Sequence, residues 1–161
     1  MNRISVDFGT SNTQIACLDA NGQPKNIGDI IPTVLYVDGA AGCIHVGMAA
    51  VHAYEHALNA KKEDASSYYL ETFKPDLCLA RVNPGDLTVL TGVNGKLMTW
   101  LEVLAACFSH FRQFAEEKEF AGAAVEEIVL THPVNFPNLD LYREAALKAG
   151  FQKVYFVQEP E

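Results

Sequence analysis

The stretch that decides the fold is "ISVDFGTSNTQIACLD", residues 4–19. Two short runs of β-forming residues, Arg3 to Phe8 and Thr13 to Asp19, are separated by a loop that contains Gly9, and this pattern predicts a β-hairpin. The Asp-Phe-Gly tripeptide that begins at Asp7 also holds magnesium in protein kinases, where it follows a glycine-rich loop and a catalytic loop. Only six residues precede Asp7 here. From this position we do not expect a protein kinase.

The loop after Asp7 carries groups that suit a bound phosphate. Gly9 has no Cβ to obstruct a ligand, and the successive amides from Thr10 to Asn12 can converge on an anion. The hydroxyls of Thr10 and Ser11 add neutral donors. Asp7 would repel phosphate unless a cation or its water shell lay between them. These residues predict a magnesium nucleotide site, and an ordinary hairpin turn with a capping aspartate is the alternative.

Length, composition and charge narrow the class of protein. At 161 residues and 49% hydrophobic composition, the chain is long enough to bury one core. Its formal net charge of −8 argues against a nucleic-acid partner, because affinity for phosphate backbones needs clustered Lys and Arg. No stretch resembles a signal peptide or an uninterrupted membrane span, since the most apolar segment, Leu97 to Phe120, carries several charges. We therefore expect a soluble cytoplasmic protein without a membrane partner.

The spacing of the cysteines and histidines does not predict a metal site. The cysteines lie far apart, which favours reduced, mostly buried thiols over a zinc site or a disulfide framework. They are Cys17, Cys43, Cys78 and Cys107. His52 and His56 stand four apart and could supply two metal ligands, but the sequence places no third, so an exposed helix face is preferred. His132 has the side chain of a general base and is interpreted as structural.

The middle of the chain predicts one further strand, a short helix and a second hairpin. Val34 to Val37, after Pro32, predicts the third strand. The alanine-rich segment from Gly47 to Ala60 suits a short helix. Asn94 and Gly95 between two apolar runs predict the hairpin, because this dipeptide tolerates the positive φ angles of a tight turn.

The second half predicts helices that alternate with strands. A long helix begins near Thr99, which has the capping-box spacing to Glu102. Its apolar residues recur at spacings of four and three, as in a helix packed on a sheet. They are Leu97, Leu101, Leu104, Phe108 and Phe111. A strand at Ile128 to Thr131, a helix from Asn138 to Ala149 and a strand at Val154 to Val157 follow. The order predicts the α/β class, with a mixed five-stranded sheet on the ribonuclease-H-like plan and a small α+β insertion at about residues 40–96.

Several stretches, taken in order, resemble the actin-like ATPases and, among them, the DnaK chaperones of the heat shock protein 70 family. They are "VDFGTSNT" (6–13), "IPTVLYVDG" (31–39), "HVGMAA" (45–50), "VNGKLMTWLEVL" (93–104), "IVLTHPVNF" (128–136) and "AGFQKVYFVQEP" (149–160). The form "HPVNF" and the Phe8 that follows Asp7 look closest to the divergent YegD-type branch. The resemblance covers the N-terminal lobe of an ATPase domain, and the family's second phosphate motif and adenosine motif would lie beyond Glu161.

The resemblance implies roles for individual residues. Asp7 matches the acid that contacts the magnesium ion through water, and Glu159 matches the glutamate near the metal. Lys74, in "ETFKPDL", matches a lysine that orients the attacking water. Pro133 matches the proline that switches the domain interface. The loop around the β- and γ-phosphates corresponds to four residues, Gly9, Thr10, Ser11 and Asn12.

The resemblance implies the N-terminal fragment of a DnaK-like chaperone ATPase, whose intact parent binds and hydrolyses ATP with Mg²⁺. Its partners would be ATP or ADP, a second ATPase lobe and, through the parent, client proteins or co-chaperones. Half of the nucleotide cleft would be missing from these residues, so we expect the isolated chain to bind ATP weakly or not at all and to show no measurable turnover.

Two alternatives share the superfamily scaffold. One is a phosphotransferase of the sugar or acetate kinase type, against which the "NGKLMTWLEVL" stretch and the Glu-Pro pair near the end argue. The other is a non-enzymatic actin-like assembly module. A panel of phosphate acceptors with labelled ATP separates the first from an ATPase, and nucleotide-dependent filament formation would favour the second.

Overall fold

The computed structural model describes residues 1–39, 41–61, 67–71, 73–86 and 98–160. The strands of the larger sheet are β1 (Asn2–Phe8), β2 (Asn12–Leu18), β3 (Pro24–Asn26), β4 (Ile31–Pro32), β8 (Val125–His132) and β9 (Lys153–Gln158). A smaller sheet contains β5 (Leu35–Asp38), β6 (Cys43–Val46) and β7 (Tyr68–Leu70). The helices are α1 (Met48–Asn59), α2 (Lys74–Leu79), α3 (Trp100–Lys118) and α4 (Leu139–Lys148).

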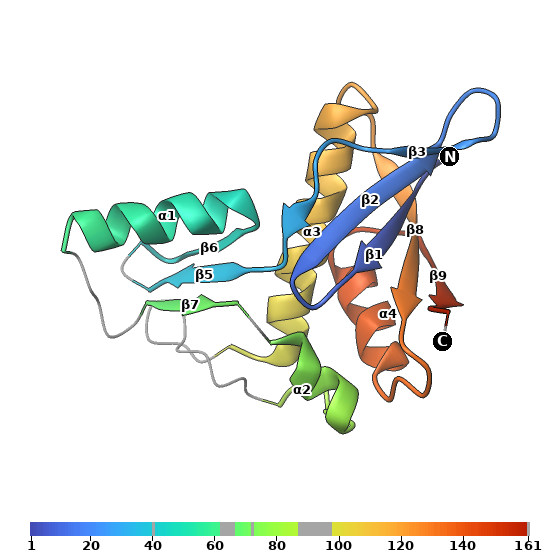
Figure 1. Cartoon of the computed structure of the whole chain (residues 1–161). Coiled ribbons are helices and arrows are strands. Elements are labelled where there is room, and N and C mark those ends of the chain that lie inside the picture. The colour runs from blue at the N-terminus through green and yellow to red at the C-terminus, as the bar shows by residue number, and fades with distance from the viewer. Residues whose placement is uncertain (40, 62–66, 72, 87–97, 161) are drawn as a thin grey trace.

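The larger sheet is mixed, as the sequence predicted, but among the described residues it has six strands, since the short β4 adds to the predicted five. Its strand order is β3-β2-β1-β8-β9, and β4 also pairs with β2. The pairs β1–β2 and β2–β3 are antiparallel, whereas β1–β8 and β8–β9 are parallel. The opening hairpin is thus confirmed, with Asp7 opposite Gln14 and Phe8 opposite Thr13. Figure 1 shows the small sheet and α1 projecting to one side of this larger sheet.

The predicted third strand belongs to the other sheet, which is a correction. Val34 to Val37 overlaps β5, which pairs with β6 and β7, and the third strand of the larger sheet is the short β3. The chain changes direction after Pro32, where the amide of Val34 donates to the Pro32 carbonyl at 3.0 Å. Proline has no amide hydrogen to continue a ladder, so the strand ends there.

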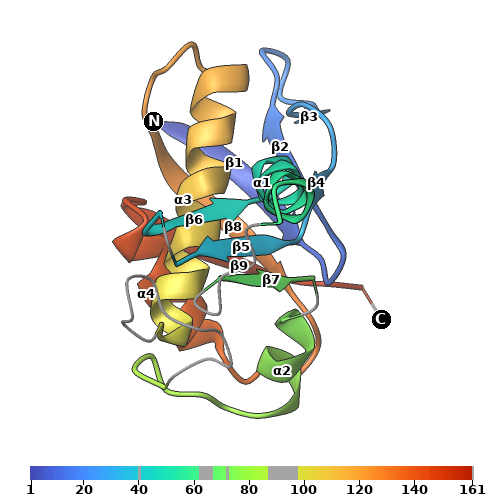
Figure 2. The same ribbon diagram turned by 90° about the vertical axis from the view of Figure 1, so that its left-hand side faces the viewer.

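Helices α3 and α4 pack together on one face of the larger sheet (Figure 2). The predicted capping box is present: the Glu102 amide donates to the Thr99 hydroxyl at 3.2 Å, and the Thr99 amide to the Glu102 carboxylate at 2.8 Å. Of the apolar face predicted for this helix, Leu104, Phe108 and Phe111 are fully buried, Leu101 is partly buried, and Leu97 lies outside the described residues. The amphipathic pattern therefore identified the face that packs on the sheet.

The C-terminal strand-helix-strand unit follows the prediction closely. Ile128 to Thr131 lies inside β8, and the predicted helix corresponds to α4 with its C-cap at Ala149. Gly150 has a φ of 102°, a conformation that favours glycine at a helix end. Strand β9 contains the predicted run from Val154 to Val157.

The small sheet separates two apolar layers. Leu35 and Val37 of β5 face the main core, whereas Tyr36 faces α1 and packs with Ala50. The predicted insertion at about residues 40–96 remains a prediction, although the small sheet also takes in β5 before residue 40. The hairpin predicted at Asn94-Gly95 lies outside the described residues. Among the helices of the described segments, none is long and apolar enough to cross a bilayer.

Candidate functional site at the strand ends

The carboxyl ends of three parallel strands meet at one edge of the larger sheet. Asp7 lies near the end of β1, Thr131 near the end of β8, and Glu159 directly after β9. The Thr131 hydroxyl donates to Asp7 Oδ1 at 3.2 Å, and the Glu159 amide donates to the His132 carbonyl at 2.8 Å. Open α/β sheets bind ligands outside the carboxyl ends of their strands, so this edge is a candidate site.

The loop from Gly9 to Asn12, which we call the strand-end loop, lies beside these strand ends. The Gly9 amide donates to the carbonyls of Asn12 at 3.0 Å and of Asp7 at 3.2 Å. A Cβ at Gly9 would overlap the Asn12 carbonyl oxygen, so the turn requires glycine. The residues at Thr10, Ser11 and Asn12 are exposed, as is Asp7. Their polar groups are therefore open to a ligand from solvent.

Lys74 differs from Asp7 and the loop residues of the predicted site, because it is buried. Only 4% of this residue is exposed, and no salt bridge to it occurs within the described residues. It opens α2, and its Nζ lies 5.2 Å from the centre of the Phe8 ring. Burial lowers the pKa of its ammonium, while the charges of Glu159, Cys78 and Asp7 act in the opposite direction. A buried, unpaired cation near two carboxylates is typical of a functional site.

Phe8 joins the candidate site to the core. Strand residues alternate between faces, so the exposed Asp7 is followed by a Phe8 that is completely buried. The Phe8 ring packs at centroid distances of 5.6–6.1 Å against four aromatic rings, those of Phe73, Phe108, Phe111 and Tyr142. Phe73 directly precedes Lys74, so this packing also holds the lysine near β1.

Two residues of this region were missed by reasoning from the sequence. Thr131 donates a hydrogen bond to Asp7. The two residues lie side by side because the parallel strands β1 and β8 pair Val6 with Leu130, a register that the sequence alone does not show. Tyr142 is buried, and its hydroxyl has no hydrogen-bond partner among the described residues. Burial raises its pKa well above the usual value. Nothing in the sequence indicated this hydroxyl, since Tyr142 occupies an apolar helix position.

The sequence also singled out two histidines of α1 and the His132-Pro133 pair at the end of β8. His52 and His56 are both exposed on α1, as expected. His132 Nδ1 is 2.9 Å from the Pro133 carbonyl oxygen, which fits the structural role predicted for this histidine. Pro133 follows β8, and its part in a domain interface remains a prediction.

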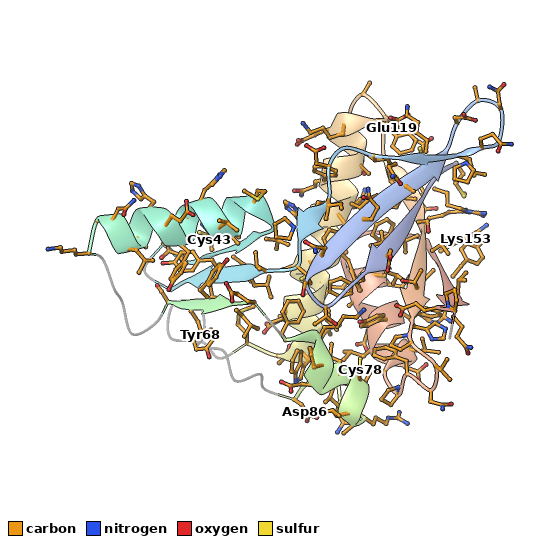
Figure 3. All side chains as sticks on the ribbon, in the orientation of Figure 1. Cys43, Tyr68, Cys78, Asp86, Glu119 and Lys153 are labelled. Carbon is orange, nitrogen blue, oxygen red and sulfur yellow. The ribbon has the colours of Figure 1, made fainter. Side chains whose placement is uncertain are left out.

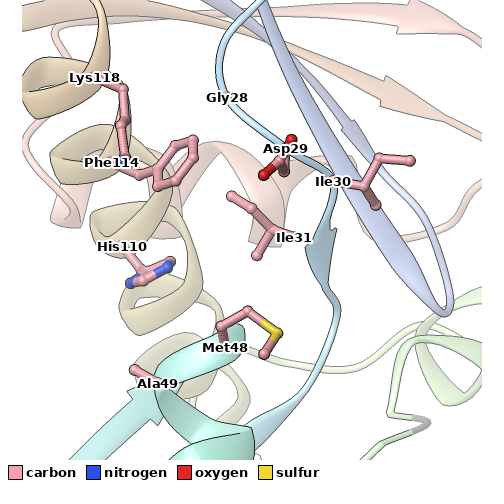
Figure 4. Close-up of a pocket in the computed structure, with 9 residues that line it drawn as sticks. All are labelled: Gly28, Asp29, Ile30, Ile31, Met48, Ala49, His110, Phe114 and Lys118. Carbon is pink, nitrogen blue, oxygen red and sulfur yellow. The ribbon is translucent and has the colours of Figure 1, made fainter.

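A pocket of about 320 Å³ lies between α3, residues 28–31 around the start of β4, and the first turn of α1 (Figure 4). His110 and Phe114 of α3 face Ile31 and Met48 across it. Burial lowers the pKa of the His110 imidazole, and the charge of Glu117 acts against this. None of the residues predicted to bind nucleotide is among the described residues that line this pocket.

No protein-family model matches the chain, and no curated protein matches it in sequence. In three dimensions the chain is similar to MreB5 of Spiroplasma citri, whose crystal structure contains bound ADP. The TM-score is 0.55 with 16% sequence identity, over 97% of this chain and 37% of the MreB5 chain. The chain therefore shares the mixed α/β fold of part of that protein, which confirms the predicted fold class. It spans little more than a third of the length of that neighbour.

Proposed function

We propose that the chain forms the first lobe of an actin-like ATPase and binds the phosphates of Mg·ATP or Mg·ADP at the strand-end loop. Gly9, Thr10, Ser11 and Asn12 supply amides and hydroxyls to the phosphates. The MreB5 structure supports this proposal, because that protein binds ADP and has the same fold.

The burial of Lys74 is the observation that carries the proposal. An unpaired ammonium in a protein interior costs several kcal/mol of hydration unless an anion compensates it, roughly the penalty for any buried ion. A triphosphate at the adjacent loop would supply that anion. The burial of Lys74 beside Phe8 is therefore explained if the site binds phosphate, and it is costly if the site has no ligand.

The residues present also suit magnesium. Asp7 and Glu159 offer carboxylate oxygens, the ligand type that Mg²⁺ prefers, and Asp7 is exposed enough to contact a hydrated ion. When bound, the ion would neutralise phosphate charge. The chain's own contribution is then positional: Thr131 orients the Asp7 carboxylate, and Lys74 holds a water in place for attack on phosphorus.

A narrower proposal follows from Lys74, since a lysine at this position is what the resemblance to DnaK implies. On this proposal the intact parent is a DnaK-like chaperone that hydrolyses ATP and meets client proteins or co-chaperones through regions outside these residues. Phosphate release from a parent polypeptide that includes a second lobe tests it. We expect slow hydrolysis that is lost in Asp7→Ala and Lys74→Ala, whereas the 161-residue chain alone is inactive. Robust hydrolysis by the 161-residue chain alone would contradict the proposal that the ATP site is shared between two lobes.

The phosphate loop can be tested on this chain directly. We expect inorganic triphosphate with Mg²⁺ to shift the NMR amide signals of residues 9–12, with a dissociation constant in the millimolar range. Gly9→Ala should abolish these shifts, because the added methyl group overlaps the Asn12 carbonyl. Gly85→Ala is the matched control, since nothing lies within 4 Å of the methyl group it adds. Shifts that survive Gly9→Ala, or that occur only elsewhere, would refute the proposed loop.

A non-enzymatic actin-like assembly module is the second candidate, and the fold similarity to MreB5 over 97% of the chain favours it. Light scattering by the parent protein after nucleotide addition distinguishes the two. Growth in scattering that does not require hydrolysis would support assembly, whereas turnover without scattering would support the ATPase. Transfer of labelled phosphate to a sugar or to acetate would instead indicate a phosphotransferase.

A further inference from the structure

Three potential metal ligands gather at one end of the small sheet, away from the strand-end loop. Asp38 ends β5, and Cys43 and His45 lie on β6. One ligand atom from each residue lies within 4.8 Å of the other two. All three residues are partly buried, so a solvated ion can reach them and still lose part of its water shell.

The hairpin geometry explains why these side chains meet. Asp38 pairs directly with Cys43, and opposed residues of an antiparallel pair project from the same face of the sheet. His45 lies two residues further along β6 and therefore shares that face. Its ring stacks on Tyr36, the residue opposite it, at a centroid distance of 6.1 Å and an interplanar angle of 18°. The imidazole is thus held over the same face as the thiol.

We propose that Asp38, Cys43 and His45 form a zinc-binding site. Thiolate, imidazole and carboxylate are the three ligand types of protein zinc sites, and a site with three protein ligands leaves the fourth tetrahedral position to water. The 3.3 Å separation of Cys43 Sγ and His45 Nε2 shows that the two softer donors already converge. A thiolate also selects zinc over magnesium, so this site does not compete for the nucleotide's metal ion.

Pairwise spacing of cysteines could not reveal this site, because only one cysteine takes part. The other free cysteines are Cys17 and Cys107, which are buried, and the exposed Cys78. Figure 3 shows Cys43 in the small sheet near α1 and Cys78 on α2. A bound ion would tie β5 to β6 and stabilise the end of the hairpin.

Zinc titration by calorimetry tests the proposal on the 161-residue chain, with Co²⁺ as a spectroscopic probe. We expect one zinc ion per chain with a dissociation constant in the micromolar range or below. Removing a direct ligand should weaken binding by more than the roughly 10–100-fold seen when an outer partner of a metal ligand is lost. Cys43→Ser, His45→Gln and Asp38→Asn should therefore each bind at least tenfold more weakly. Bound Co²⁺ should show a thiolate charge-transfer band that Cys43→Ser removes.

Two control variants separate this site from other possible ligands. Cys78→Ser removes an exposed thiol, and the double change His52→Gln with His56→Gln removes the exposed histidine pair of α1. Both should bind zinc as the unaltered chain does, and circular dichroism should show that every variant is folded. The proposal is overturned if no zinc binds in the micromolar range, if binding survives Cys43→Ser, or if it is lost with the histidine pair.

Discussion

The two sheets of the molecule are stabilised in different ways. The larger sheet is covered by α3 and α4, and its core centres on the completely buried Phe8 with aromatic rings on several sides. The small sheet has a minor apolar cluster against α1, where Tyr54 stacks on Tyr69 at a centroid distance of 4.1 Å. One part thus has a deep core, whereas the other depends on a few partly buried rings and on its second face against the main core.

The residues of the candidate site depend on different sheets. Asp7, Thr131 and Glu159 come from the larger sheet and are fixed by its ladder. Lys74 instead follows β7 of the small sheet and reaches the site because Phe73 and Leu77 are buried in the main core. The loop from Gly9 to Asn12 should therefore be as stable as the fold itself, whereas the placement of Lys74 depends on both sheets.

Phe8→Ala should cause the largest loss of stability. Truncation of a completely buried phenylalanine typically costs about 3–5 kcal/mol, through lost burial and the cavity left behind. Urea unfolding should show this decrease, and hydrogen exchange should show lost protection in β1, β8 and α3 together. Leu18→Ala is the control, since 67% of Leu18 is exposed and its truncation should change stability by less than about 0.5 kcal/mol. If Phe8→Ala lowered the free energy of unfolding only slightly, the stability of the core would depend mainly on other residues.

Tyr54→Ala should have a smaller and more local effect. Loss of the ring stack with Tyr69 should cost about 1–2 kcal/mol, the scale of an aromatic pair with some buried area. We expect faster hydrogen exchange in α1, β5 and β7 and little change in β1 or β8. Glu55→Ala changes an exposed neighbour on the same helix and should leave exchange unaltered. If Tyr54→Ala loosened both sheets equally, the two would be one cooperative unit.

Local signals predicted much of the fold, because they depend on neighbours in sequence. The capping box of Thr99 and Glu102 identified the start of α3, and the glycine between two β-rich runs identified the first hairpin. The sheet to which β5 belongs could not be predicted in this way. Residues 35–37 are buried on both faces, so their pattern indicates a strand without indicating its partners.

The candidate site shows the same limit. Asp7 and the loop from Gly9 to Asn12 are contiguous, so the sequence indicated their chemistry directly. Lys74 is different, because a lysine beside Pro75 and Asp76 resembles an exposed residue, and only the resemblance to a family assigned it a role. Its ammonium lies over the ring of Phe8, which is far away in the sequence.

Lys74→Met should increase stability and abolish function. Its effect on stability should be the smallest of the three substitutions. Because burial lowers the pKa of Lys74, the folded state binds fewer protons than the unfolded state at pH values between the lowered pKa and 10.5. Its stability is therefore reduced at neutral pH and recovers as the pH rises toward 10.5. Lys74→Met removes the buried charge and should raise the free energy of unfolding at pH 7 by about 1 kcal/mol, within the usual range for single stabilising changes.

This gain should shrink as the pH rises toward 10.5, because the unaltered lysine then loses its charge more easily in the folded state. Lys148→Met, at an exposed position of α4, should show neither the gain nor its pH dependence. Urea unfolding at a series of pH values measures the gain in stability and its pH dependence. In the two-lobe parent, Lys74→Met should abolish phosphate release although the fold is more stable, as expected when a residue is retained for function at a cost in stability. A destabilised Lys74→Met would instead show that the ammonium holds α2 in place as part of the structure.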